Sequence, residues 1–453
     1  MDERTKQLEH SSIPKLLVRL SLPAMTGMMV EAMYNVVGRM FIGRAQVGMA
    51  GPAGLAGMTI CFPFMMVMMA FTLLISVGGA ARISMALGKG DKDAAESIVA
   101  TGALLAVCFG ILYMTVGLIF LDQILIFFGA DYVTLPYARA YMRVILLGAV
   151  PNMFAFALNR YILAQGNAIF AMKSLLVSCG LNVILTPLFI YAFEWGVEGA
   201  AIATSISWTV KAVWVALFYV RKQGSLRLKI RGVVVRASVV LSILSIGIAP
   251  FSLQLTNSLT NSILNNALRV HGGAMAISAM GAIVSVMQFF QMPLFGLNHG
   301  NQPIVGYNYG AQNYSRVRQA FRLTLISGTA ISVIGFILIM SIPHALIGLF
   351  SADPEVLDIG ERSIRIFLMA LPAFGIIVNG QNFFSVTGRP HIAMTITLGR
   401  QALLISGLLI LPRFFALDGV FASAPFADII SFAVAAIFVA FEWRRLKRID
   451  PTV

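Results

Sequence analysis

The chain has 453 residues, of which 58% are hydrophobic and 11% charged, and its mean hydropathy is +0.85. A soluble protein of this length cannot bury so much apolar surface in one core, so the composition excludes a water-soluble globular fold. The net charge of +14 does not indicate nucleic-acid binding. The basic residues lie in short loops between apolar runs, where a positive-inside topology and anionic lipid account for them.

Apolar segments long enough to cross a bilayer follow one another along the whole chain. The polar N-terminal residues lead into the first of them without a signal-peptide cleavage site, so we expect this first helix to be retained. The pattern predicts an all-α integral membrane protein with twelve transmembrane helices. These cover approximately residues 15–41, 53–87, 97–121, 135–164, 168–192, 199–221, 237–267, 274–306, 319–343, 359–387, 392–415 and 419–443.

The charges of the loops indicate which side of the membrane each loop faces. The even-numbered loops and the C-terminus are rich in Lys and Arg, as in Arg82, Lys89 and Lys92 between the second and third segments. The odd-numbered loops carry more acids, as in Glu194 and Glu198. Because cytoplasmic loops carry the excess of basic residues, we expect both termini to be cytoplasmic.

The second half of the chain repeats features of the first. Gly166 corresponds to Gly388 and Pro187 to Pro412, and other pairs are separated by a similar 221–227 positions. Six spans per half is an even number, so the two halves have the same orientation and are related by an axis along the membrane normal. The repeat predicts two pseudo-symmetric six-helix bundles. These are an N-terminal lobe over residues 1–221 and a C-terminal lobe over 237–453, joined by a basic cytoplasmic linker over 222–236.

Two such bundles with a cleft between them can expose a central cavity to each side of the membrane in turn, which favours a carrier. A channel is the alternative, but no filter-like backbone motif or ring of acids is present. The sequence also contains no nucleotide-binding loop, zinc motif or nucleophile elbow. We therefore expect neither an enzyme, nor a bound cofactor, nor ATP-driven transport.

Several short motifs are distributed over both halves of the chain, and the most specific is QPIVGYNYGA at residues 302–311. The others are EAMYNVV at 31–37, LGKGD at 87–91, AQGN at 164–167, NVILTPLFI at 182–190, GVEGAAIAT at 196–204 and LDGV at 417–420. Together these motifs resemble those of MATE (multidrug and toxic compound extrusion) transporters of the MOP superfamily. The resemblance covers nearly the whole chain and fits the bacterial DinF/MepA-like branch.

The resemblance implies an antiporter in a bacterial or archaeal cytoplasmic membrane. Such a protein exports small amphipathic, often cationic, compounds against inward H⁺ or Na⁺ movement and needs no cofactor beyond that ion. We expect a monomer whose partners are small-molecule substrates and membrane lipid. Relatives usually carry one Asp after Tyr-Asn-Val-Val and another before the proline of the fifth helix, and these acids are credited with cation coupling. This chain has Gly38 and Thr186 there, so the resemblance does not carry the coupling site over.

Glu31 is the sharpest candidate for a replacement coupling residue. It lies two helical turns before Gly38, on the same face of the first span. A carboxylate inside a span is costly and is usually functional. The alternative is a carboxylate neutralised by a neighbouring base such as Arg39. Arg39 in turn either faces the cavity, where it repels cationic compounds, or snorkels to the interface.

Other polar residues within the predicted spans serve either the cavity or hydrogen bonds between helices. Arg400 and Asp428 are expected to form an intramembrane pair, first as a structural contact and second as a further coupling locus. The seventh segment carries polar residues at a spacing of three and four, which predicts a polar stripe facing the cavity. The histidines, His299 among them, are predicted near span ends. The full candidate set is Glu31, Asn35, Arg39, Asn152, Asn182, Thr186, Gln254, Asn257, Asn261, Gln288, Asn379, Arg400 and Asp428, with no metal ligand assigned.

Two further function classes remain open from the sequence. A flippase or exporter for a lipid-linked or biosynthetic precursor would be supported by many cavity arginines, of which only Arg39, Arg160 and Arg400 qualify. A membrane enzyme or receptor would need a clustered catalytic set, which the sequence lacks. Transport measurements with imposed H⁺ or Na⁺ gradients separate these classes.

Overall fold

The computed structural model describes residues 8–9, 11–44, 52–130, 132, 134–228, 236–350 and 354–449. Within those ranges, the side chains of residues 31–44, 52–56, 59, 258 and 274 lie outside the description. The first half of the chain forms α2 (Ile13–Arg44), α3 (Pro52–Gly88), α4 (Lys92–Ile119), α5 (Leu121–Phe127), α6 (Leu135–Leu147), α7 (Ala149–Ala164), α8 (Ala168–Pro187), the π-helix η1 (Leu188–Ala192) and α9 (Gly196–Val220).

The second half forms α10 (Ala237–Gly310), α11 (Tyr314–Ser341), α12 (Pro343–Gly348), α13 (Pro354–Phe367), α14 (Leu371–Val386), α15 (Pro390–Ile410) and α16 (Pro412–Ile449). Ten of the described helical segments are long and apolar enough to cross a membrane, and twelve are if each of two bent pairs is one span. The prediction of twelve membrane helices is confirmed on that count. The two pairs are α6 with α7 and α13 with α14, bent by 50° and 52°.

The backbone breaks at equivalent places in the two halves. Gly166 and Gly388, which follow the bent pairs, both have left-handed backbone angles, with φ of 83° and 77°. Glycine adopts this conformation without steric cost, so it ends a helix cleanly. At the start of another equivalent pair of helices, α4 and α11, Asp91 and Asn313 each accept a hydrogen bond from a first-turn backbone N–H. The repeat is therefore visible in the backbone conformation at the helix ends as well as in the residue types.

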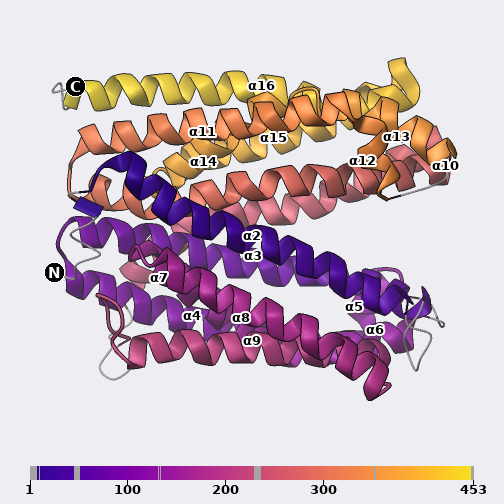
Figure 1. The fold of residues 1–453 in the computed structure, drawn as a ribbon, viewed down its shortest axis with the longest axis horizontal. Helices are drawn as coiled ribbons and strands as arrows, with labels where there is room; N and C mark the ends of the chain where they lie inside the picture. Colours follow the sequence, from indigo (N-terminus) through magenta and orange to yellow (C-terminus); the bar gives the residue numbers. More distant parts are fainter. Residues whose placement is uncertain are drawn as a thin grey trace.

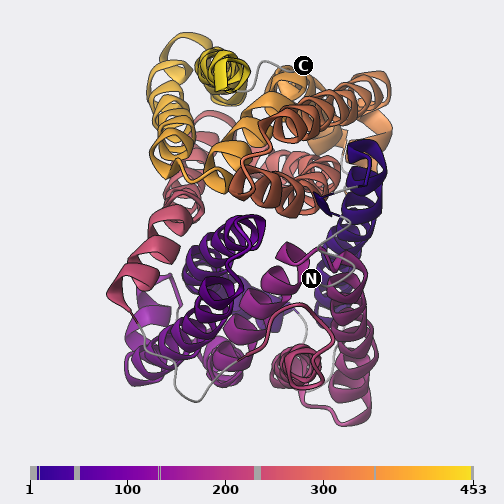
Figure 2. The same cartoon turned by 90° about the vertical axis from the view of Figure 1, so that its left-hand side faces the viewer.

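The helices form two bundles that pack side by side (Figure 1). The first bundle contains α2–α9 and the second contains α10–α16, and both chain ends lie at the same end of the molecule, here called the terminal end. Seen from that end, α2 lies along one edge of the seam between the bundles and the first part of α10 lies along the other (Figure 2). α2 and α3 make most of their contacts across the seam with α10.

Backbone contacts at glycine hold the seam together. A methyl group on Gly88 of α3 would lie 1.8 Å from the carbonyl oxygen of Tyr307 on α10. A methyl group on Gly310 would lie 2.1 Å from the carbonyl oxygen of Met85. The two contacts exchange equivalent positions of the repeat, as the pseudo-twofold axis requires. Helices in lipid associate mainly through such close packing, because apolar side chains gain nothing by leaving lipid tails.

The same arrangement continues deeper along the seam. A methyl group on Gly247 of α10 would lie 1.8 Å from the carbonyl oxygen of Leu74 on α3. Across the axis, a methyl group on Gly296 of α10 would lie 2.4 Å from Cα of Met25 on α2. These contacts lie in the half of the seam toward the terminal end. Side-chain hydrogen bonds cross the seam beside them, from Ser21 Oγ to the carbonyl oxygen of Leu297 at 3.3 Å and from Arg82 Nε to that of Ser242 at 3.2 Å.

The segment before α2 covers the seam at the terminal end. Leu8 is only 1% exposed, and its side chain is the nearest neighbour of Gly166 in the first bundle. Its carbonyl oxygen accepts hydrogen bonds from Asn308 Nδ2 at 3.3 Å and from Arg316 Nη2 at 3.1 Å, both in the second bundle. Arg316 also donates to the carbonyl oxygen of Ser11 at 2.7 Å. The N-terminal segment thus joins the two bundles where they close.

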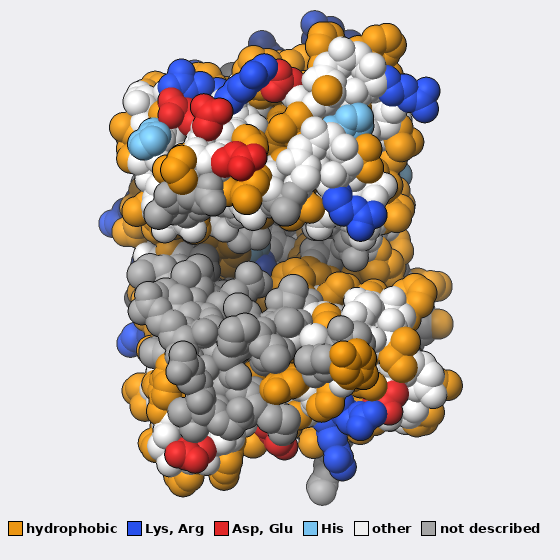
Figure 3. Space-filling view, turned by 90° about the vertical axis from the view of Figure 1, so that its right-hand side faces the viewer, with side chains coloured by type: hydrophobic (Ala, Val, Ile, Leu, Met, Phe, Trp, Pro, Cys, Tyr) orange, Lys and Arg blue, Asp and Glu red, His pale blue; other side chains and the backbone are white. Residues whose placement is uncertain are grey.

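The opposite end has another shape. Its surface is indented between the two bundles (Figure 3). The described part of the seam is therefore closed by backbone contacts toward the termini, and the surface is indented between the bundles at the other end (Figure 3).

We predict that Gly88→Leu forces α3 and α10 apart at the terminal end. Ser84 reports on that opening, because it is fully buried and lies against Gly306. In protein whose native cysteines are replaced by Ala, Gly88→Leu should raise the rate at which a water-soluble maleimide modifies Ser84→Cys by about tenfold, or about 1.4 kcal/mol in the opening equilibrium.

Gly180→Leu serves as the matched control, since an added side chain at Gly180 meets nothing within 4 Å. It should leave the modification rate of Ser84→Cys unchanged. Equal rates in the Gly88→Leu and Gly180→Leu proteins would show that the glycine contacts do not seal the seam.

Candidate functional site

The polar residues predicted on α8 bond to one another inside the first bundle. Asn182 Nδ2 donates to Thr204 Oγ1 of α9 at 3.1 Å, and Thr186 Oγ1 donates to Asn182 Oδ1 at 3.2 Å. Asn182 and Thr186 are both buried. Their hydrogen-bonding groups therefore hold α8 against α9. Thr186, which replaces the Asp of related chains, acts in this structure as a neutral helix-packing residue.

Among the other predicted residues of the first bundle, only the side chain of Asn152 is described, and its one hydrogen bond is weak. Asn152 of α7 is half-buried, and its Nδ2 lies 3.8 Å from Met68 Sδ on α3, a weak hydrogen bond. Glu31, Asn35 and Arg39 belong to α2, and their side chains lie outside the described residues. Their roles stay predictions.

Two cations inside the first bundle share one aromatic ring. The guanidinium carbon of Arg160 on α7 lies 5.2 Å from the centroid of the Phe156 ring, and Lys211 Nζ on α9 lies 5.6 Å from it. Both distances are within the range of cation–π attraction. Lys211 is only 8% exposed. Lys211 was not among the predicted site residues, although a lone lysine in the apolar run 199–221 is the sequence signal that marks it.

His299 corrects one expectation about the histidines. It lies well inside the span Met275–Gly310 rather than near its end, because α10 continues to Gly310 without a break after Gly273. It is close enough to Arg160 for their charges to interact. Arg160 of the first bundle thus lies within electrostatic range of a residue of α10.

The polar stripe predicted on the first part of α10 does not face one way. Gln254 Nε2 lies 2.7 Å from Met66 Sδ on α3, across the seam. Asn257 instead turns into the second bundle, where its Oδ1 accepts from Gln401 Nε2 of α15 at 2.5 Å, and Thr260 Oγ1 donates to Gln401 Oε1 at 3.1 Å. Asn261 is exposed. The stripe therefore serves contact between helices at two of its positions.

The intramembrane pair predicted between α15 and α16 is present. Arg400 Nε donates to Asp428 Oδ1 at 2.5 Å, and the two side chains are 19% and 10% exposed. The guanidinium carbon of Arg400 also lies 5.5 Å from the centroid of the Phe374 ring on α14. A buried carboxylate held this way is stable only while its partner stays in place.

Asn379 and Gln288 have contrasting surroundings. Asn379 of α14 is buried, accepts from Asn298 Nδ2 at 2.8 Å and donates to the carbonyl oxygen of Thr324 at 3.2 Å. These hydrogen bonds of Asn379 link α14 to α10 and α11. Gln288 is exposed on α10. The candidate set thus divides into separate clusters in the two bundles, and the described side chains bring together no group of three His, Cys, Asp or Glu that could hold a metal ion.

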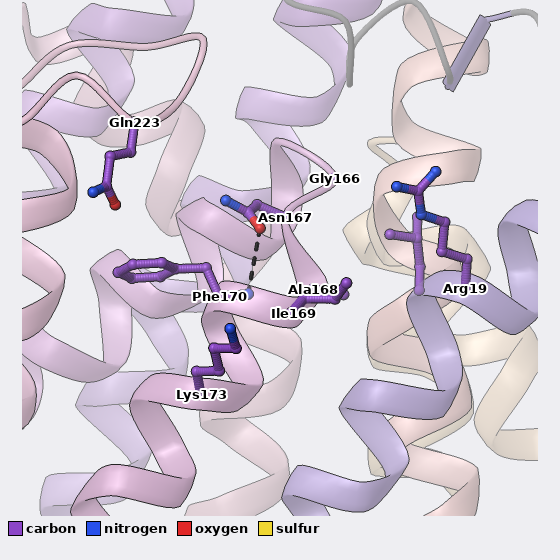
Figure 4. Close-up of a pocket in the computed structure, with 9 residues that line it drawn as sticks. Arg19, Gly166, Asn167, Ala168, Ile169, Phe170, Lys173 and Gln223 are labelled. Atoms are coloured by element: carbon purple, nitrogen blue, oxygen red, sulfur yellow. Dashed lines mark hydrogen bonds between the residues drawn. The ribbon is translucent and has the colours of Figure 1, made fainter.

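A cavity of about 390 Å³ lies at the terminal end between α2 and α8 (Figure 4). Arg19, Lys173, Asn167 and Gln223 supply its polar lining. Asn167 Oδ1 accepts from the Phe170 backbone N–H at 3.3 Å and so caps α8. None of the predicted site residues lines this cavity.

We predict that breaking the buried pair destabilises the protein strongly. Arg400→Met leaves the Asp428 carboxylate buried without its partner and should cost about 3–5 kcal/mol, with a clear fall in the melting temperature of the purified protein. Arg400→Met combined with Asp428→Leu should recover most of that loss, because neither variant side chain carries a charge.

The exposed pair Arg362–Asp418 is the matched control, with side chains 71% and 36% exposed. Arg362→Gln should change the stability by no more than about 1 kcal/mol. A melting temperature as low for Arg362→Gln as for Arg400→Met would contradict the assignment of Arg400–Asp428 as the critical ion pair.

A family model described as MatE matches residues 23–188 and 250–408, one stretch in each half of the chain. The multidrug export protein MepA of Staphylococcus haemolyticus (strain JCSC1435) is 26% identical over 449 residues, which cover 99% of this chain and 98% of that relative. MepA of Staphylococcus aureus (strain MSSA476) has the same identity and coverage.

Solved structures show the same fold. A MOP superfamily transporter from Pyrococcus furiosus, whose reversed pocket polarity is said to suggest a different function, has 23% identity and a TM-score of 0.92, covering 97% of this chain and 98% of that one. An outward-facing multidrug resistance MATE transporter has 23% identity and a TM-score of 0.91, covering 98% of each chain. Since the family model covers most of both bundles, this chain belongs to the MATE family of membrane transporters.

Proposed function

We propose that the protein is a secondary active exporter of small amphipathic organic compounds, which works by alternating access and is coupled to inward H⁺ or Na⁺ movement. The observation that carries this proposal is the seam, with glycine contacts at the terminal end and a hollow at the other. A carrier needs one closed side and one accessible side at a time. The relatives named as multidrug export proteins support the same direction and breadth of transport.

The topology follows from the positions of the charges. Lys89, Lys92 and Lys222 lie in connections at the terminal end, beside the C-terminal bases of α16. The positive-inside rule supports a cytoplasmic terminal end and hence two cytoplasmic termini in a bacterial or archaeal membrane. In that orientation the closed side faces the cytoplasm and the hollow faces out. We propose the predicted boundaries, with lobes over 1–221 and 237–453, for a protein that works as a monomer.

Two acids are the proposed coupling residues. Asp428 is nearly buried and held by Arg400, so ion or proton binding at its carboxylate must compete with that contact. This competition supports a change of packing between α15 and α16 when the ion binds. Glu31 is the proposed acid of the first bundle, on the strength of its position within α2.

Transport in proteoliposomes tests the proposal. With an imposed H⁺ or Na⁺ gradient, the wild-type protein should drive uptake of a tested amphipathic dye. Asp428→Asn should reduce this uptake by about tenfold or more while leaving dye counterflow without a gradient intact, because counterflow needs binding and alternation but no coupling ion. Glu31→Gln should behave in the same way.

Asp418→Asn is the control, since Asp418 lies exposed at the end away from the termini. Its gradient-driven uptake should equal that of the wild type. Transport that ignores both gradients would exclude a coupled antiporter, and gradient-driven uptake that survives Glu31→Gln would remove Glu31 as a coupling residue.

A further inference from the structure

We propose that the cavity at the terminal end between α2 and α8 binds the phosphate group of an anionic membrane lipid. This site is separate from export, and only its assignment to the cytoplasmic leaflet rests on the proposed topology. The cavity has a volume of about 390 Å³, and its charged lining consists of Arg19 on α2 and Lys173 on α8 (Figure 4). None of its nine described lining residues is acidic, so the cavity attracts an anion.

The start of α8 supplies hydrogen-bond donors to the cavity. Ala168 and Ile169 line it and are the first two residues of α8. Backbone N–H groups at these positions have no acceptor within an α-helix. The helix dipole adds partial positive charge at the same place, and phosphate binds well to such helix ends.

Asn167 is a buried polar side chain that lines the cavity. It is only 7% exposed, and its Oδ1 accepts from the Phe170 backbone N–H at 3.3 Å, which fixes the orientation of the amide. Its Nδ2 amino group makes no hydrogen bond to any residue that the structure describes. A buried donor without an acceptor costs free energy, and a phosphate oxygen in the cavity supplies the acceptor.

Lys173 provides the principal charge. It is exposed, lines the cavity and forms no ion pair with any described residue. Arg19 is a second cation on the other helix, but it also interacts with another group of the protein. We therefore place the phosphate against Lys173 and Asn167, with Arg19 as an additional source of positive potential.

The depth of the cavity and its neighbours identify a lipid as the source of the phosphate. Arg19 and Lys173 lie six and five residues into two membrane spans, about 8–9 Å from the helix ends, near the boundary between headgroups and acyl chains. Beside them, Val18 and Leu22 of α2 are 63% and 59% exposed, and Ile169 of α8 is 46% exposed. A phosphate with acyl chains contacts both the bases and these apolar side chains, whereas inorganic phosphate contacts only the bases.

The equivalent place in the second bundle is filled by the protein itself. Gly388 corresponds to Gly166, so Arg389 corresponds to Asn167. Arg389 is paired with the buried Glu442 of α16. The second bundle thus supplies its own carboxylate at this turn. The first bundle has an uncharged amide there, and its donor is left for an oxyanion from outside the chain.

Native mass spectrometry of the full-length protein in detergent micelles tests the proposal by measuring the affinity for the first bound lipid. Phosphatidylglycerol and phosphatidylcholine with identical acyl chains are the probes, because only phosphatidylglycerol carries a net negative charge. The wild-type protein should bind phosphatidylglycerol at least about fivefold more tightly. Lys173→Met should lower the affinity for phosphatidylglycerol about fivefold and leave that for phosphatidylcholine unchanged, since it removes one base at the membrane surface.

Asn167→Asp separates binding from folding. Asp caps a helix as well as Asn does, so the melting temperature should stay the same. Its carboxylate removes the amino donor and repels phosphate, so the affinity for phosphatidylglycerol should fall at least about tenfold. Lys173→Arg should retain the wild-type affinity, because it keeps the charge.

Lys89→Met is the matched control, since Lys89 is an exposed lysine at the same end of the molecule and does not line the cavity. It should bind phosphatidylglycerol as the wild type does. Equal wild-type affinity for the two lipids would overturn the proposal, as would a preference for phosphatidylglycerol that survives both Lys173→Met and Asn167→Asp, or an equal loss in Lys89→Met.

sn-Glycerol 3-phosphate, which has the phosphate but no acyl chains, distinguishes a lipid from a free phosphate. It should not displace phosphatidylglycerol at the same concentration. Equal affinity for the two would overturn the lipid as the source and leave a site for free phosphate. Because no ion gradient is imposed, failure of the proposed export function would leave all of these affinities unchanged.

Discussion

The direct contact of helix backbones at the seam is the constraint on which the rest of the structure depends. Gly88 and Gly310 allow α3 and α10 to touch through their peptide groups, and no other residue type fits in either position without moving a helix. Such contacts have large packing area and no side-chain entropy to lose. The glycine contacts themselves can separate and re-form without the withdrawal of a side chain, although hydrogen bonds such as that from Arg82 Nε to the carbonyl oxygen of Ser242 also cross the seam and must break. A seal of this kind is strong and still reversible.

The sequence predicted the architecture well because its signals are physical and local. Apolar length defines a span, and glycine or proline defines where it bends or ends, so the bend at α6 and α7 recurs at α13 and α14. The prediction that His299 lies near the end of a span was wrong because a helix can continue beyond its apolar stretch. The residues after 306 are polar enough to resemble a loop, yet α10 continues to Gly310.

The candidate residues were harder to predict than the helices. Periodicity places Gln254 and Asn257 on similar faces of one helix, but one bonds across the seam to Met66 and the other bonds within its own bundle to Gln401. That choice depends on neighbours distant in sequence, which spacing alone does not reveal. Arg400 and Asp428 were predictable as a pair because two opposite charges within one bundle have few other ways to avoid an isolated charge in lipid. Lys211 was missed because it belongs to no motif, and its only signal in the sequence is a single charge within an apolar run.

The segment before α2 has a mechanical consequence. It leaves the first bundle, buries Leu8 against Gly166 and accepts hydrogen bonds from Asn308 and Arg316 of the second. Any widening of the seam at that end stretches a short tether whose two anchors move apart, so these hydrogen bonds must break before the bundles part. In the alternating-access cycle that we propose, this segment therefore adds an activation barrier to opening at the terminal end, and the dwell time of the closed state depends in part on Leu8 and Ser11, which precede the first span.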